Sequence, residues 1–156
     1  MNFLSIYFAA ALLFLAAPCS AELKDVQFIK GKCGKGSHIA EGRIGEDLTK
    51  RQSRFFCDYA VIAFFDNNNQ HIMVQFSESQ SHNNILLGFA GIMSEDGQIL
   101  YVSRVYLGNK QIQVPEGYCK FFFKNKHMSG IACGAPVDEG DRRTVPVVEF
   151  HASPGQ

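Results

Sequence analysis

Two charged residues lie in segments whose other residues are mostly apolar, where an enzyme could keep catalytic groups. Glu149 lies in the run Thr144–Phe150 and Arg104 lies in the run Ile99–Leu107. A glycosidase or small ribonuclease needs a glutamate with a histidine or arginine, or two carboxylates, on one concave surface. The same placement also arises in a half-buried strand, whose alternate side chains face solvent. We therefore expect Glu149 and Arg104 on a solvent face, with a Glu/Arg/His cluster as the enzymatic alternative.

Other signatures of catalysis or metal binding are absent from the sequence. There is no G-x-S-x-G nucleophile motif, and the glycine-rich run Gly31–Gly36 lacks the residue order of a phosphate-binding loop. Neither Asp66–Asn69 nor Asp138–Asp141 carries the full EF-hand pattern. No two histidines have the spacing of a metal-binding pair; they are His38, His71, His82, His127 and His151. We predict no catalytic residue, no metal site and no cofactor.

Of the five cysteines, four lie beyond the apolar N-terminal segment. An even set in an exported chain of this size is typical of two disulfides. Folding the chain as a hairpin centred on Lys126 places Cys119 directly opposite Cys133, which leaves Cys33 to pair with Cys57. Each bond would contribute roughly 3 kcal/mol in the loop-entropy description. A four-cysteine zinc site is the alternative, although the closely spaced pairs typical of such sites are missing.

The same hairpin register predicts a candidate interface. Phe121 and Phe123 share the apolar face with the two cysteines, so Phe122 points the other way, between Lys120 and Lys124. An exposed aromatic ring flanked by lysines is a candidate interface anchor. The alternative is that a helix or the C-terminal tail covers the ring.

The segment Met1–Ala21 has the pattern of a signal peptide. Its apolar run, Phe8–Ala17, has the length of a signal core and is too short for the roughly 20 residues that span a bilayer. Pro18 ends the run, and small residues precede the expected cleavage site. No lysine or arginine precedes the run, so an uncleaved anchor and lipidation at Cys19 are alternatives. We expect a signal peptide over 1–21 and one globular domain over 22–156, periplasmic or secreted, without stable membrane insertion after cleavage.

The charge balance argues against two classes of partner. Lysine plus arginine and aspartate plus glutamate number 15 each, so the formal net charge is zero. Nucleic acid and anionic membrane surfaces both favour strongly basic proteins, so we expect neither as the main partner. The apolar content of 46% fits a packed domain and excludes disorder for most of the chain.

One helix is predicted, over Gly45–Tyr59. Acidic residues precede basic ones along this segment, as the helix dipole favours, and its apolar residues have partial helical periodicity.

Most of the remaining chain consists of short apolar or alternating runs separated by turn residues, as in strands. The predicted strands include Ala60–Phe65, His71–Phe76, Ile85–Met93, Ile99–Leu107, Gln111–Val114 and Thr144–Phe150. Polar connections are expected at Asp66–Gln70 and Ser77–Asn84, and Pro146 suggests an edge strand or a bulge. Tight turns imply antiparallel pairing, so the fold class is mainly β: an antiparallel β-meander sheet or small barrel with one short helix, stabilised by disulfides.

Together these patterns predict a small exported protein that binds another exported protein without catalysing a reaction, as an inhibitor or accessory protein. A small secreted hydrolase with a Glu/Arg/His cluster is the first alternative. A small-ligand carrier is the second, and it requires an apolar cavity inside the barrel.

Overall fold

The structure, a computed structural model, describes residues 23–65, 70–77 and 86–155. Within these ranges the chain forms twelve β-strands and no helix. In chain order they are β1 (Asp25–Cys33), β2 (His38–Arg43), β3 (Gln52–Arg54), β4 (Tyr59–Phe64), β5 (His71–Ser77), β6 (Leu87–Met93), β7 (Ile99–Leu107), β8 (Lys110–Gln113), β9 (Tyr118–Lys124), β10 (His127–Gly134), β11 (Val137–Glu139) and β12 (Arg142–Ala152).

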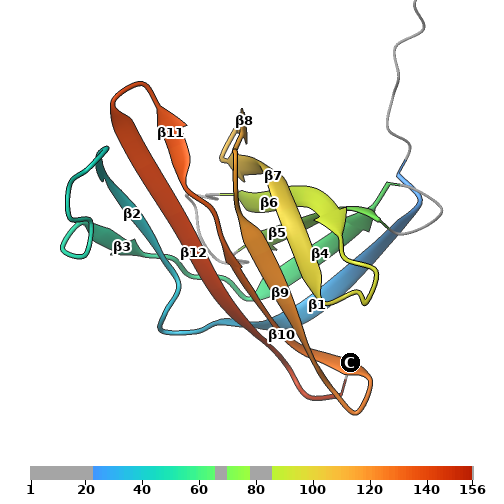
Figure 1. Ribbon diagram of the computed structural model, residues 1–156. Helices are drawn as coiled ribbons and strands as arrows, with labels where there is room; N and C mark the ends of the chain where they lie inside the picture. The colour runs from blue at the N-terminus through green and yellow to red at the C-terminus, as the bar shows by residue number, and fades with distance from the viewer. Residues whose placement is uncertain (1–22, 66–69, 78–85, 156) are drawn as a thin grey trace, which may run out of the picture.

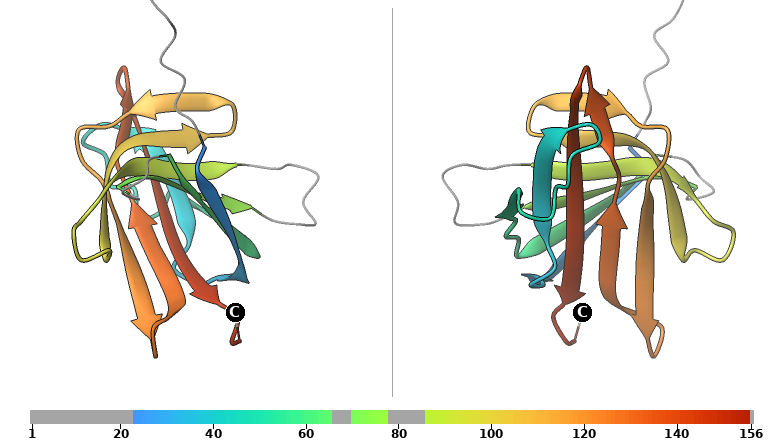
Figure 2. Two further views of the ribbon diagram at one scale, coloured as in Figure 1. Left: turned by 90° about the vertical axis from the view of Figure 1, so that its right-hand side faces the viewer. Right: turned by 60° about the vertical axis from the view of Figure 1, so that its left-hand side comes forward.

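Eight of these strands close into an antiparallel barrel (Figures 1 and 2). They pair in the order β1-β4-β5-β6-β7-β9-β10-β12, and β12 also pairs with β1. The closing seam is short: Lys32 pairs with His151, and one further pair lies on each side. Closure gives most of the barrel wall a partner strand on both sides and so removes exposed edges. Of the two predicted architectures, a meander sheet and a small barrel, the chain therefore adopts the barrel.

β12 projects beyond the barrel, with β2 and β11 on either side of it (Figure 1). Pro146 of β12 is buried and lies opposite Ile39 of β2. On the other side of β12, the pairing with β11 ends at Thr144 and the pairing with β10 begins at Val147. The expectation of an edge strand or a bulge at Pro146 is therefore wrong, because β12 has partners on both sides and its register with β2 is continuous. The proline lies where one partner strand gives way to the next, so its missing N–H interrupts no ladder on that side.

Aromatic rings fill the interior of the barrel. Inward positions alternate with outward ones along each strand, and those of β5 (Ile72, Val74 and Phe76) are buried. The ring of Phe76 lies 6.3 Å from that of Phe89 and 5.9 Å from that of Phe150, measured between centroids. Burying each ring contributes about 1.5–3 kcal/mol, so these contacts hold β5, β6 and β12 together across the lumen.

Both predicted disulfides are present. Cys119–Cys133 joins β9 to β10 at directly opposite positions. Cys33–Cys57 joins the end of β1 to the segment that follows β3. The four cysteines therefore have no thiolate to offer a metal, and the alternative of a four-cysteine zinc site is wrong.

The β9–β10 hairpin keeps its predicted register as far as Phe122 and then shifts by one residue. Phe123 consequently lies opposite Met128. The turn is the two-residue pair Asn125 and Lys126, whose φ angles are 51° and 68°. Positive φ at both positions is what a type I′ hairpin turn requires, so the hairpin is not centred on a single residue.

The predicted helix over Gly45–Tyr59 is wrong. The side chain of Asp47 accepts a hydrogen bond from the backbone N–H of Thr49 at 3.0 Å, an Asx turn that competes with helix formation. The strand β3 follows, and after it Phe55 is buried whereas Phe56 is exposed. Burial that alternates between neighbours is a strand periodicity, and it places the next residue, Cys57, for its disulfide with β1.

The other predicted strands are confirmed to within about two residues as β4, β5, β6, β7, β8 and β12. The expected signal peptide, Asp66–Asn69 and the expected loop after Ser77 lie outside the described residues. Among the residues that the structure describes, no helix is long and apolar enough to cross a bilayer.

Candidate functional site

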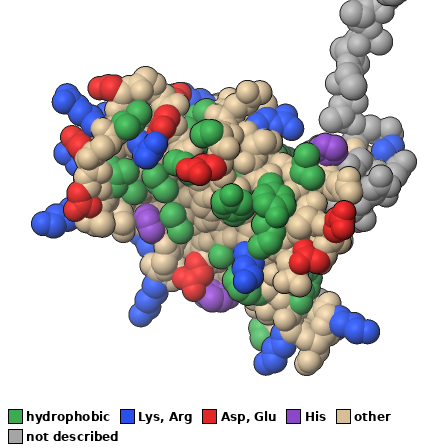
Figure 3. All heavy atoms as spheres, viewed as in Figure 1, with side chains coloured by type: hydrophobic (Ala, Val, Ile, Leu, Met, Phe, Trp, Pro, Cys, Tyr) green, Lys and Arg blue, Asp and Glu red, His purple; other side chains and the backbone are tan. Residues whose placement is uncertain are grey.

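An aromatic patch lies on the outer surface of β6, β7 and β9. Tyr101 of β7 lies directly opposite Ile92 of β6 and Tyr118 of β9. The two tyrosine rings meet edge to face, with centroids 5.8 Å apart. The exposed fractions are 51% for Ile92, 54% for Tyr101 and 56% for Tyr118. Figure 3 shows hydrophobic side chains gathered on this side of the molecule. Isolated exposed apolar residues are ordinary, whereas a contiguous group is typical of an interaction surface.

Phe122 lies on the outer side of β9, as its alternation predicts. Its ring is 43% exposed, and the ammonium nitrogen of Lys120 lies 5.4 Å from the ring centroid. Gly130, opposite on β10, has no side chain with which to cover the ring. Lys124 is exposed at the end of the strand, so neither a helix nor the described part of the tail buries this group. We refer to Ile92, Tyr101, Tyr118 and Phe122 as the aromatic face.

Beyond β10, the strand β12 presents Glu149 and His151 on the same side of the barrel. Glu149 Oε1 lies 3.1 Å from His151 Nε2, and Glu149 Oε2 accepts a hydrogen bond from the backbone N–H of Gly36 at 3.2 Å. The buried Ser37 hydroxyl donates to the Glu149 carbonyl and accepts from the Glu149 N–H, at 3.1 and 2.9 Å. The partners of Glu149 therefore hold the loop after β1 against the barrel.

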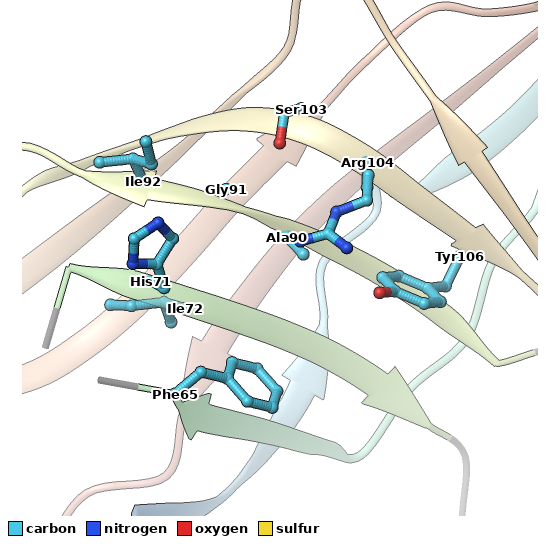
Figure 4. A pocket seen from close by; sticks show the side chains of 9 residues that line it. All are labelled: Phe65, His71, Ile72, Ala90, Gly91, Ile92, Ser103, Arg104 and Tyr106. Atoms are coloured by element: carbon cyan, nitrogen blue, oxygen red, sulfur yellow. The ribbon is translucent and has the colours of Figure 1, made fainter. Parts of the chain in front are cut away.

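A depression of about 480 Å³ lies on the outer surface of β5, β6 and β7 (Figure 4). Ala90 lies at its floor, and the guanidinium of Arg104 extends toward it beside the Tyr106 ring, with His71 at the other end. Ile92 also lines the depression, which therefore adjoins the aromatic face. No aspartate or glutamate is among the described residues that line it, so Arg104 gives this end of the surface a positive charge.

A bulge in β7 accompanies this depression. The register between β6 and β7 shifts between Ala90 and Gly91, which leaves Ser103 as an extra residue. A Cβ on Gly91 would lie 1.8 Å from the carbonyl oxygen of Tyr101, so this close approach of two backbones requires glycine. The bulge was not predicted, although a glycine inside a strand is a signal that indicates one.

Arg104 and Glu149 do not come together. They lie on β7 and β12, with β9 and β10 between these strands. The histidine beside Glu149 is His151, whereas Arg104 shares its depression with His71. Among the described residues, Arg104 and Glu149 therefore do not form the single Glu/Arg/His cluster that the hydrolase alternative needs.

The other two described histidines, His38 and His127, lie on different strands, β2 and β10. His38 Nδ1 lies 2.7 Å from the carbonyl oxygen of Gly36, His127 is exposed next to the hairpin turn, and His82 lies outside the described residues. In the described part of the chain, no group of three histidine, cysteine, aspartate or glutamate side chains is placed to hold a metal ion.

The turn between β6 and β7 gives the aromatic face an acidic border. Glu95 and Asp96 line a hollow of about 590 Å³ together with Tyr101. The Ser94 hydroxyl donates a hydrogen bond to Asp96 at 2.6 Å, and the backbone N–H of Gln98 donates another at 3.1 Å. These two hydrogen bonds lower the pKa of Asp96 below its ordinary value, so its carboxylate stays ionised beside the aromatic residues.

Alternation along one strand predicts that Lys120, Phe122 and Lys124 share an outer face, whereas Ile92, Tyr101 and Tyr118 were not predicted as part of it. Alternation along each strand could have indicated that these three point outward. Their contact with one another depends on how β6, β7 and β9 are aligned, which no single segment specifies.

Comparisons with family models, with curated proteins and with solved structures find no match.

Proposed function

We propose that this protein is exported and binds another exported protein through the aromatic face, without catalysing a reaction. In one version of this proposal, binding inhibits the partner protein. Two disulfides fit an oxidising compartment, such as the periplasm or the extracellular space.

The observation that carries the proposal is the exposure of Phe122 on a rigid support. Cys119–Cys133 holds β9 to β10 within the same hairpin, so the backbone that carries Phe122 is restrained. Binding then orders few side chains, and little conformational entropy is lost. Aromatic residues beside cations dominate the binding energy of many interfaces, and the Lys120–Phe122 pair has this composition.

The distribution of charge constrains the partner. Cations lie at Lys120, Lys124 and Arg104, whereas Glu95 and Asp96 lie at the turn that borders Tyr101. Complementary potentials favour a partner with an apolar pocket for Phe122 and acidic groups facing the two lysines. The exposed tyrosines can lose their apolar surface to such a partner while their hydroxyl groups keep hydrogen bonds at the rim.

Site-specific photocrosslinking tests this proposal in cells that export the protein. A benzoyl-phenylalanine at position 122 or 118 is expected to capture one and the same partner, identified by mass spectrometry. The matched control is position 56. Phe56 is also exposed, and the Arg54 guanidinium lies 5.3 Å from its ring centroid. Phe56 lies in the segment after β3, however, whereas Phe122 lies on β9.

The affinity of two variants for the captured protein then tests whether Phe122 is the contact. We expect Phe122→Ala to weaken binding at least tenfold, the loss of about 1.4 kcal/mol or more that marks an important contact. Phe56→Ala should change the affinity less than twofold. Equal capture at positions 56 and 122, or an affinity that survives Phe122→Ala, would contradict the proposal.

A further inference from the structure

One end of the barrel lumen contains an apolar pocket of about 240 Å³. Ile62, Ile72 and Phe121 are buried at this pocket, and each occupies an inward position of its strand. Met93 and Met128 are half-buried, and Phe123, also on the inner side of β9, is 52% exposed. The mouth of the pocket therefore lies at the barrel end that carries the β6–β7 and β9–β10 turns, and its floor lies inside the barrel.

Aromatic side chains bound the pocket on its inner side. Phe76, Phe89 and Phe150 are fully buried and in ring contact, so the pocket does not extend through them. At the pocket, Gly97 contributes no side chain, and Met128 belongs to the part of β10 where the register shifts. The inward-facing side chains at this end of the barrel consequently surround the pocket but do not fill it.

Strand pairing does not extend around the whole barrel beside the pocket. β1 pairs with β12 only over Gly31–Cys33, and β12 pairs with β10 only from Gly130 onward. Among the described strands, no ladder therefore joins the segment of β1 around Gln27 to the segment of β10 around Met128. Both residues line the pocket, so no strand ladder closes this side of it.

The lining defines the chemistry of the ligand. None of the described lining residues is charged, and Gln27 is the one with a polar side chain. A carboxylate or ammonium group would lose its hydration here without gaining a counter-ion. Sulfur atoms of methionine make favourable contacts with aromatic rings, and phenylalanine rings pack against them edge to face.

We propose that this pocket binds a small uncharged aromatic molecule with one hydrogen-bonding group directed at Gln27. An apolar cavity of roughly 150 Å³ takes benzene, so by proportion this pocket takes a molecule of roughly ten non-hydrogen atoms. The site is separate from the aromatic face, because Ile62, Ile72 and Phe121 are buried inside the barrel whereas the residues of the aromatic face are exposed on its outer side.

Indole is a suitable probe, because it is uncharged, has about this size and carries a single N–H. We expect titration of the disulfide-bonded protein, labelled at its methionine methyl groups, to shift the NMR signals of Met93 and Met128 saturably. Met73 is an internal control, since it lies on the outer side of β5 between Ala63 and Ala90.

Two variants locate the binding. Gln27→Leu should weaken indole roughly 2- to 10-fold, as expected for one hydrogen bond, and should leave benzothiophene, which has the same shape without the N–H, unchanged. Met128→Trp should fill the pocket and weaken both probes more than tenfold. Phe122→Ala should leave indole binding unchanged, so failure of this site and failure of the aromatic face are distinguishable.

Three results would overturn the inference. The first is the absence of a saturable shift at Met93 and Met128. The second is equal weakening of indole and benzothiophene by Gln27→Leu in a variant whose methyl spectrum is native. The third is a larger shift at Met73 than at the two pocket methionines, which would place indole on the outer surface.

Discussion

The ammonium group of Lys120 lies 5.4 Å from the centroid of the Phe122 ring, two positions away on the outer side of the same strand. An exposed cation–π pair contributes only about 0.5–1 kcal/mol, so it adds little to the stability of the fold. Its consequence is geometric. Alternate positions of β9 place the ring and the positive charge side by side, and the disulfide Cys119–Cys133 holds this strand to β10.

Reversing the charge at Lys120 should slow association with the partner. We expect Lys120→Glu to lower the association rate constant roughly tenfold at low salt, because the acid opposes the acidic groups proposed on the partner. The difference should shrink at high salt, where exposed charges are screened. Stopped-flow or surface-plasmon measurements check this, with Lys120→Arg as the variant that keeps the rate. A rate that does not depend on salt in either variant would argue against steering by this charge.

Removing either disulfide should destabilise the protein by about 2–4 kcal/mol. The change is Cys119→Ala together with Cys133→Ala, or Cys33→Ala together with Cys57→Ala, so that no free thiol is left. Urea unfolding at neutral pH measures the free energy, and each double variant should unfold at lower urea than the parent. An unchanged midpoint in either variant would mean that the bond is absent or carries no constraint.

Ser37 should matter more for stability than its size suggests. Its buried hydroxyl both donates to and accepts from the backbone of Glu149, so Ser37→Ala leaves a backbone N–H without this partner. We expect a loss of about 1–3 kcal/mol in urea unfolding. Ser53→Ala is the control: Ser53 is exposed and its hydroxyl only donates to the Ile39 carbonyl, so the loss should stay below about 0.5 kcal/mol. Equal losses would show that the two hydrogen bonds of Ser37 stabilise the fold no more than the single bond of Ser53.

The ion pair between Asp138 and Arg143 should make part of the stability depend on pH. Two hydrogen bonds of 2.7 Å from the guanidinium lower the pKa of Asp138 below its ordinary value. A lowered pKa means that the folded state binds its proton less readily than the unfolded state. The contribution is therefore complete above the unfolded pKa of about 3.9 and disappears as the pH falls through the folded pKa.

Asp138→Asn tests this directly. The difference in urea midpoint between the parent and the variant should be constant at neutral pH and should shrink as the pH falls below about 4. Asp141→Asn, in the adjacent turn, controls for removal of a charge from this region. A difference that persists unchanged into strong acid would contradict the assigned cause.

Intact mass of the protein recovered from the exported fraction tests processing and oxidation together. We expect a chain that begins at Glu22 and is lighter than its reduced form by two hydrogens for each of the two disulfides. Alkylation of four thiols without prior reduction would contradict the disulfide pairing. A chain that retains residues 1–21 would contradict cleavage of the predicted signal peptide.

Local pattern was sufficient to predict several features. Residues two apart on a strand share a face whatever the rest of the fold does, and this places Lys120, Phe122 and Lys124 together. A tight turn between Cys119 and Cys133 likewise brings the two cysteines opposite each other, and the other pair follows. The predicted helix failed because its charge pattern is compatible with a helix, whereas alternating burial and the Cys33–Cys57 bond require an extended chain.

The tertiary structure alone decided how distant segments meet. Closure of the barrel depends on Lys32 of β1 reaching His151 of β12, and the contact of Tyr101 with Tyr118 depends on the alignment of β7 with β9. Such pairings arise from packing the whole core, because backbone hydrogen bonds are similar for every register and only the buried side chains distinguish one from another. For the same reason the separation of Arg104 from Glu149, and the pocket at the end of the lumen, are properties of the assembled barrel and of no single segment.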